Sequence, residues 1–154
     1  MQKILGKSIP NEVASAILAR QFATEFLEPI KNFTVFLDGG LGAGKTFWVR
    51  EILQYFGVRE SVISPTYTYM QLYSIENKKI VHFDCYRLKN SSEFKTKGFE
   101  EIAHDSSVSK FVEWGENLGV DYCREFSGTH FVVKLKHGIG VGMRRIDIFK
   151  STPA

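Results

Sequence analysis

The amino-acid sequence predicts a three-layer α/β fold in which a mixed central sheet is extended by antiparallel hairpins. An apolar run at residues 33–37 leads directly into a glycine-rich turn, and an amphipathic stretch follows at 45–56. This order is typical of a strand, a phosphate-binding loop and a helix. Two later pairs of strand-like runs, each joined by a turn, predict the hairpins. No repeat or linker divides the chain, so we expect a single domain over residues 1–150 and a short tail over 151–154 that frays.

The first half of the chain is expected to contain two helices and one strand. Residues 11–26 predict a helix, because apolar residues recur at a spacing of three to five on one face, namely Val13, Ile17, Leu18, Phe22 and Phe26. The run at 33–37 is β-branched and aromatic, which favours a buried strand. The helix at 45–56 is expected to stop at Gly57, because glycine readily adopts the left-handed conformation that follows many helices.

The second half of the chain is expected to supply most of the sheet. Residues 66–74 and 79–86 predict two strands of a hairpin. Asn90 is expected to cap a helix that is interrupted near Gly98 and resumes until about His104. The remaining strands are predicted at 108–114, at 131–136 and at 144–149, with a loop over 115–128. The last two strands form the second hairpin, across a glycine-rich turn.

The composition indicates an ordinary globular domain, because 44% of the residues are hydrophobic and 24% are charged. A net charge of +3 is too small to imply nucleic-acid binding by itself. Cys85 and Cys123 form neither a metal-binding spacing nor a disulfide framework. The sequence has no apolar run near the ~18 residues of a membrane span and no signal-like start. We therefore expect a cytoplasmic protein that does not cross a membrane.

Residues 39–46 match the phosphate-binding pattern G-x-x-x-x-G-K-[ST]. The glycines permit positive φ angles and close approach, so that successive amides can surround phosphate oxygens. A helix that starts near Lys45 directs its positive dipole end at the same anion, and Lys45 adds a full charge toward the β- and γ-phosphates. The Thr46 hydroxyl is placed to bind Mg²⁺. The pattern therefore predicts a site for ATP and Mg²⁺ on a P-loop NTPase-like fold.

Two carboxylates are candidates for the metal site. Asp84 and Glu113 each end an apolar run, so a strand end would carry them toward the loop. An ordinary solvated strand end is the alternative for either acid. The hydroxyl-rich segment 64–68 is a candidate γ-phosphate switch, but its residue types alone favour a strand. His82 and His104 are expected to be structural or surface residues and not ligands. Trp48 and Trp114 are expected to be core or interface aromatics and not platforms for adenine.

Four stretches of the chain together resemble one family, the bacterial TsaE (YjeE) ATPases of tRNA threonylcarbamoyladenosine biosynthesis. They are L-G-A-G-K-T at 41–46, S-P-T-Y-T at 64–68, H-F-D-C-Y-R-L at 82–88 and V-E-W at 112–114. The loop pattern is shared by many families, whereas the last three stretches in this order are far more specific. The chain departs from the family pattern at Gly40, where an Asp is usual, at Gly115, where Pro is frequent, and at Cys85, where Leu is common.

The resemblance implies a role for each candidate residue. Asp84 becomes the Walker-B-like acid, Glu113 a residue of the Mg²⁺ site, and Thr66 a switch residue facing the γ-phosphate. The expected catalytic residues are Lys45, Asp84 and Glu113, and the expected metal ligands are Thr46, Asp84 and Glu113. The expected nucleotide-binding residues are Glu12, Gly39, Gly42, Ala43, Gly44, Lys45, Thr46, Phe47, Thr66 and Arg144. Arg144 also has the strand phase of Ile146 and Ile148, which favours an inward direction, although an edge arginine is the alternative.

The resemblance further implies a slow ATPase that supports the tRNA threonylcarbamoyladenosine modification complex. The implied partners are a TsaD-type transferase and a TsaB-type companion protein. The basic residues within 131–150 could contact tRNA directly, but the modest net charge favours a solvated face. Any tRNA contact is therefore expected to be weak or indirect.

Three other functions are compatible with a phosphate-binding loop. A small-molecule kinase would need an arginine-rich lid, and no compact lid segment is evident. A GTP-binding switch would need an acid that residues 77–80 lack. A nucleotide-gated adaptor with incidental hydrolysis differs from the ATPase only in rate, so the residues leave it open.

Overall fold

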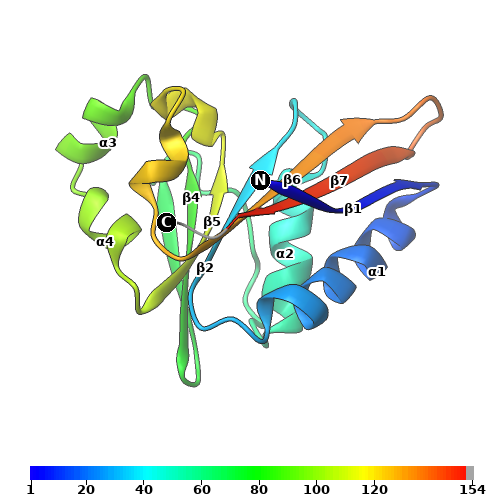
Figure 1. Ribbon diagram of the computed structural model, residues 1–154, viewed down its shortest axis with the longest axis horizontal. Coiled ribbons are helices and arrows are strands. Elements are labelled where there is room, and N and C mark those ends of the chain that lie inside the picture. Colours follow the sequence, from blue (N-terminus) through cyan, green and yellow to red (C-terminus); the bar gives the residue numbers. More distant parts are fainter. Residues whose placement is uncertain (152–154) are drawn as a thin grey trace.

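A computed structural model describes residues 1–151 as a seven-stranded sheet with helices on both faces (Figure 1). The strand order is β1-β7-β6-β2-β5-β4-β3. The strands are β1 (Gln2–Ile9), β2 (Phe33–Asp38), β3 (Met70–Ile75), β4 (Lys78–Asp84), β5 (Val108–Glu113), β6 (Thr129–His137) and β7 (Arg144–Ser151). Ser151 is thus the end of a strand and not the start of a tail, and the other predicted tail residues, 152–154, lie outside the described part.

The sheet is mixed, as predicted. Strands β4, β5, β2 and β6 run parallel to one another. The antiparallel pairs are β3 with β4, β6 with β7, and β1 with β7. Both predicted hairpins are therefore confirmed. The parallel core places the carboxyl ends of β2, β5 and β4 at one edge of the sheet, where ligands bind in open α/β folds.

Helices cover both faces of the sheet and make the three layers. α1 (Glu12–Phe22) and α2 (Lys45–Tyr55) lie on one face, and α3 (Ser91–Thr96) and α4 (Glu100–His104) lie on the other (Figure 1). Short turns of helix are η1 (Ala23–Leu27), η2 (Gly115–Leu118) and η3 (Tyr122–Glu125). No helix within residues 1–151 is long and apolar enough to span a membrane.

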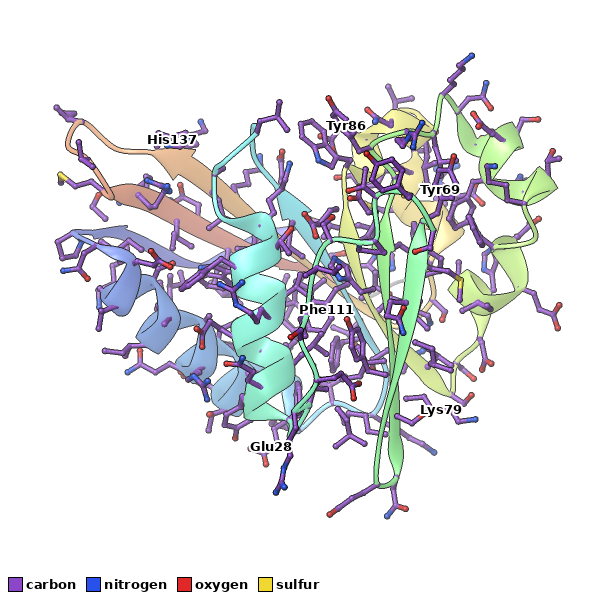
Figure 2. The ribbon with its side chains drawn as sticks, turned by 180° about the vertical axis from the view of Figure 1, so that it is seen from behind. Glu28, Tyr69, Lys79, Tyr86, Phe111 and His137 are labelled. Atoms are coloured by element: carbon purple, nitrogen blue, oxygen red, sulfur yellow. The ribbon has the colours of Figure 1, made fainter. Side chains whose placement is uncertain are left out.

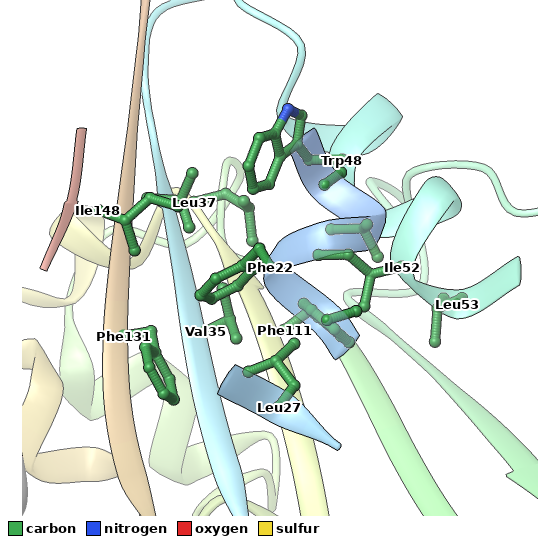
Figure 3. Packing of buried hydrophobic residues seen from close by; sticks show 14 of the residues in the cluster. Phe22, Leu27, Val35, Leu37, Trp48, Ile52, Leu53, Phe111, Phe131 and Ile148 are labelled. Carbon is green, nitrogen blue, oxygen red and sulfur yellow. The ribbon is translucent and has the colours of Figure 1, made fainter. Parts of the chain in front are cut away.

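The core under α1 and α2 fixes the helix that follows the phosphate-binding loop. Phe22 of α1 and Trp48 and Ile52 of α2 are buried against Val35 and Leu37 of β2 (Figure 3). The Trp48 indole nitrogen donates a 2.8 Å hydrogen bond to the Ser15 hydroxyl, so the buried N–H is satisfied. This packing confirms Trp48 as a core residue and holds α2 at a fixed angle to β2.

Three elements differ from the sequence prediction. β1 was not predicted, because its edge position leaves most of its side chains exposed and removes the apolar alternation. Val13 and Ile17 were assigned to the buried face of α1, but they are 70% and 54% exposed. The buried face of that helix instead carries Ser15, Leu18, Ala19 and Phe22.

The predicted strand at 66–74 begins only at Met70. Residues 66–69 form a turn in which Tyr69 has a φ of 69°.

The two predicted helix caps are confirmed. The Asn90 side chain accepts from the Glu93 amide at 2.9 Å, and Gly57 has a φ of 107° after α2. The expected interruption near Gly98 separates α3 from α4, and the loop at 115–128 contains the short helices η2 and η3.

Lys110 is a fully buried cation on β5, away from the predicted site. Its exposed fraction is 0%, and its Nζ donates to the Asp105 carbonyl and to the Ser127 hydroxyl, each at 2.7 Å. These bonds tie the loops before β5 and β6 to each other. Burial lowers the pKa of the Lys110 ammonium to about 8, and the charge of Asp105 opposes this shift.

We expect Lys110 to make the protein more stable as the pH rises from about 8 to 10.5. In this window the unfolded chain binds more protons than the folded protein, so removing protons favours folding, by at most about 3 kcal/mol. Urea unfolding of the wild type and of Lys110→Met at both ends of the window measures the effect. The free energy of unfolding of the wild type should rise relative to that of Lys110→Met as the pH increases. A difference that does not change with pH would contradict the prediction.

Candidate nucleotide-binding site

Three carboxylates lie at the carboxyl ends of three adjacent parallel strands. Asp38 ends β2, Glu113 ends β5 and Asp84 ends β4, and Asp84 lies opposite Glu113 in the register. Figure 2 shows Tyr86 at this end of the molecule and Lys79, from the start of β4, at the other. The sequence prediction that the strand ends bring Asp84 and Glu113 toward the loop agrees with this arrangement, and neither acid is solvated, since both are buried.

The glycine-rich loop connects β2 to α2 with the backbone that the pattern requires. Gly42 and Gly44 have φ angles of 72° and 104°, which side chains rarely tolerate. A Cβ atom at Gly39 would lie 2.6 Å from the Leu135 carbonyl oxygen, so this position also needs glycine. α2 begins at Lys45 without a side-chain cap, so its first amides have no capping partner.

Arg144, the first residue of β7, contacts the outside of this loop. Its Nε donates to the Ala43 carbonyl at 3.1 Å, and one terminal nitrogen donates to the Gly42 carbonyl at 3.3 Å. These bonds hold the two carbonyls toward β7. Arg144 is therefore bound to the loop and is not a free edge arginine.

Lys45 is buried beneath an aromatic ring. Its Nζ donates to the Gly39 carbonyl at 2.5 Å and lies 3.3 Å from the centroid of the Trp114 ring. Trp114 adopts a left-handed φ of 60°, an unusual conformation for a bulky residue and one that is over-represented at functional sites. Burial lowers the pKa of the Lys45 ammonium, although the charges of Glu113 and other nearby acids oppose the shift.

Thr46 and Glu113 are linked by hydrogen bonds. The Thr46 hydroxyl lies 2.8 and 3.0 Å from the two carboxylate oxygens of Glu113. The His82 Nε2 atom lies 2.5 Å from Glu113 Oε2. His82 is therefore neither an exposed residue nor a separate ligand, but part of the environment of Glu113.

Asp84 holds the hydroxyl-rich segment that precedes β3. Its carboxylate accepts hydrogen bonds from the hydroxyls of Ser64 and Thr66, the latter at 2.9 Å, and from the Tyr86 amide at 2.9 Å. This segment is therefore a turn bound to an acid, which explains why it does not continue β3 as a strand. The contact places Thr66 beside one of the two predicted metal-site acids.

Two neighbouring cavities collect most of the predicted residues. The first, about 340 Å³, is lined by the loop and by Lys45, Thr46, Thr66, Asp84 and Glu113. The second, about 220 Å³, is lined by Glu12, Ser15, Ala43, Phe47, Gly142 and Arg144. Ala43 lines both, so the loop lies between them. Gly39 lines neither and faces a third, open cavity beside β6.

Several contacts of the site were not anticipated from the sequence. The pairing of His82 with Glu113 and the position of the Trp114 ring over Lys45 are the clearest. The only available signal was that both residues lie within the motifs that carry the predicted acids. Neither residue has a local pattern that reveals its partner across the sheet.

The three departures from the family pattern are accommodated. A Cβ atom at Gly40 would meet no atom of the described residues within 4 Å, so glycine there reflects no steric need. At Gly115 a Cβ atom would lie 2.8 Å from the Tyr122 ring, so a larger residue would require this ring to shift. Cys85 is a buried free thiol, as expected, and burial raises its pKa, which keeps it unreactive at neutral pH.

A mixed α/β sheet, a loop of this geometry between β2 and α2, and acids at the adjacent strand ends define a protein of the P-loop NTPase-like class. The solved structure of Bacillus subtilis YdiB has the same fold, with a TM-score of 0.68 and 21% identity over 97% of this chain and 86% of that one. Because the identity is low, this likeness supports the fold alone.

Sequence comparison identifies the family. Residues 9–141 match the model of "Threonylcarbamoyl adenosine biosynthesis protein TsaE". The chain is 41% identical to a tRNA threonylcarbamoyladenosine biosynthesis protein TsaE of Rickettsia typhi over 99 residues, which are 63% of this chain and 67% of that protein. It is 46% identical to the Rickettsia conorii protein of the same name over 86 residues, 55% of this chain and 48% of the relative. The match thus spans about half to two thirds of these relatives, and the chain belongs to the TsaE family.

Proposed function

We propose that this protein binds ATP together with Mg²⁺ and hydrolyses it in support of tRNA threonylcarbamoyladenosine formation. The observation that carries the proposal is the cavity in which the phosphate-binding loop, Lys45, Thr46, Asp84 and Glu113 face one another. Family membership supports the link to tRNA modification, since the relatives are named for that pathway. We propose a cytoplasmic location for the same reason.

The triphosphate is proposed to lie along the loop. The first amides of α2 and the glycine amides would donate to its oxygens, helped by the positive end of the helix dipole. Lys45 would exchange its hydrogen bond to the Gly39 carbonyl for the β- and γ-phosphates. Its fixed charge stabilises the negative charge that develops on the transferred phosphoryl group. Arg144 supports this step indirectly, because it holds the loop carbonyls on the far side.

The metal site is proposed to use Thr46, Asp84 and Glu113. Hydroxyl and carboxylate oxygens are the ligands that Mg²⁺ prefers, so the residues present fit the ion. Bound Mg²⁺ would neutralise phosphate charge. Glu113 orients the Thr46 hydroxyl in this structure, whereas Asp84 holds Ser64 and Thr66. We therefore assign Glu113 to holding Thr46 and assign Asp84 to coupling the metal to a switch segment that contains Thr66.

The nucleoside is proposed to occupy the second cavity. Phe47 supplies an aromatic side chain there, while Glu12 and Arg144 supply polar groups at the rim. The cavity adjoins the loop through Ala43, which is where a nucleoside must lie if its phosphates follow the loop. This placement gives Glu12 and Phe47, which are distant from the metal acids in the sequence, a shared role.

The basic hairpin offers limited support for direct tRNA binding. Arg144 is engaged with the loop, and Arg145 pairs with Asp147 at 2.9 Å. Lys134 lies 5.1 Å from the Phe149 ring centroid. Because these cations already have partners within the protein, we propose that any tRNA contact is weak or indirect and that the transferase partners carry it.

Phosphate release by the purified protein tests the proposal. We expect slow, Mg²⁺-dependent ATP hydrolysis by the protein alone and faster hydrolysis when TsaD-type and TsaB-type partners and tRNA are added. Stimulation arises if the partners stabilise the catalytic arrangement of the switch segment. Hydrolysis that the partners leave unchanged, with no effect on tRNA modification, would contradict the pathway role. Phosphate transfer to a small acceptor would favour a kinase.

A further inference from the structure

His82 is a buried polar residue for which packing gives no reason. It lies on β4 between Val81 and Phe83, and its side chain is fully inaccessible. Its Nε2 atom lies 2.5 Å from Oε2 of Glu113, whose side chain is only 3% exposed. The two residues come from neighbouring strands and are held by the parallel pairing of β4 and β5.

The imidazole is only half satisfied. Within residues 1–151, its Nδ1 atom is buried without a hydrogen-bond partner. An unsatisfied buried polar atom destabilises the fold. An apolar side chain at this position would avoid that cost but would leave the buried Glu113 carboxylate with one partner fewer, so the reason for the histidine must be sought in this bond.

The bond to Glu113 provides the explanation. The Glu113 carboxylate contacts Thr46 through both oxygens and His82 through Oε2. Without His82, the described hydrogen bonds to the carboxylate come from the Thr46 hydroxyl alone. This hydroxyl can rotate, so it can follow the carboxylate into other orientations. A second bond from a rigid strand fixes the plane of the carboxylate before any ligand binds.

We propose that His82 is a positioning residue that fixes the Glu113 carboxylate so that Glu113 and Thr46 together present their oxygens to the metal. This inference rests on the proposed Mg²⁺·ATP site and goes beyond it by assigning a role to a residue that touches neither metal nor nucleotide. His82 acts only through Glu113, and its contribution disappears when Glu113 can no longer bind the metal as a carboxylate.

A pair of amide variants provides the first test. In His82→Gln the side-chain nitrogen can reach the place of Nε2 and donate to Glu113, whereas in His82→Asn it is too short. We expect His82→Asn to weaken Mn²⁺ binding, measured with a non-hydrolysable ATP analogue, and to lower kcat, each by about 10-fold to 100-fold. The KM for ATP should change little, and His82→Gln should stay within about 3-fold of the wild type.

Coupling to Glu113 separates this role from a structural one. His82→Leu should lose metal affinity as His82→Asn does, and it should also unfold at a lower urea concentration, because the buried Glu113 carboxylate loses a partner. In a Glu113→Gln background, His82→Asn should cause no further loss, because the two residues act as one unit. In the wild type without ligand, the Nε2-bound proton should give a downfield NMR signal that shifts in Glu113→Gln.

The outcomes are distinguishable from failure of the proposed function. If the wild type binds and hydrolyses Mg²⁺·ATP but His82→Asn matches it in both measurements, the positioning role is wrong and the function stands. If the double variant loses as much as His82→Asn and Glu113→Gln together, the two residues act independently, and the positioning role is wrong. If the wild type shows no Mg²⁺-dependent ATP binding, the proposed function fails and the inference fails with it. If His82→Leu does not fold, the amide pair decides.

Discussion

Replacement of Lys45 by alanine is expected to reduce kcat/KM for ATP hydrolysis by about 1,000-fold. Among residues 1–151, Lys45 is the only cationic residue lining the cavity that collects the loop and the two acids. Its ammonium group is already desolvated and directed by the Gly39 carbonyl and the Trp114 ring, so little reorganisation is needed when phosphate binds. A preorganised charge in such a site is worth far more than one in water.

The comparison needs a control for the loss of one positive charge. Lys79→Ala removes an exposed lysine at the other end of β4, as Figure 2 shows, and should leave hydrolysis unchanged. Lys45→Arg keeps the charge, but its planar guanidinium does not fit a space shaped for an ammonium group, so it should restore little activity. Circular dichroism and urea unfolding of each variant check that the fold is retained. Near-normal turnover by Lys45→Ala would show that the loop is not the catalytic phosphate site.

The parts of the site that the sequence predicts are those whose determinants are local. The loop pattern specifies its own backbone, because Gly42 and Gly44 need positive φ angles and Lys45 and Thr46 follow at once. The metal-site acids are predictable for a related reason. A carboxylate that ends an apolar strand lies at the carboxyl edge of a parallel sheet, wherever that strand is placed in the order.

The parts that could not be predicted depend on contacts between distant segments. β1 exists because its backbone pairs with β7, while its own side chains give almost no strand pattern. The orientation of α1 depends on the bond between Ser15 and the Trp48 indole, which turns a polar residue inward and leaves Ile17 exposed. The partnership of His82 and Glu113 likewise requires the strand order, because these residues are 31 positions apart.

Asp84→Asn is expected to lower the rate of hydrolysis at saturating Mg²⁺·ATP by about 100-fold. Asparagine has nearly the shape of aspartate and can still accept from the Tyr86 amide, so the turn after β4 should persist. It removes the negative charge available to the metal and replaces one acceptor oxygen with a donor that faces the Ser64 and Thr66 hydroxyls. Both changes disturb the proposed link between the metal and the switch segment.

The effect should fall on catalysis more than on nucleotide binding, because the loop and Lys45 hold the phosphates without Asp84. ADP affinity measured without Mg²⁺ should therefore change little, whereas phosphate release with Mg²⁺ should nearly stop. Glu101→Gln, an exposed acid on α4, supplies the matched control for charge. If Asp84→Asn hydrolyses ATP normally, the metal must be held without Asp84, and Glu113 with Thr46 would then form the metal site alone. Loss of partner stimulation in Ser64→Ala and Thr66→Ala, with basal hydrolysis retained, would place the switch in the segment that Asp84 holds.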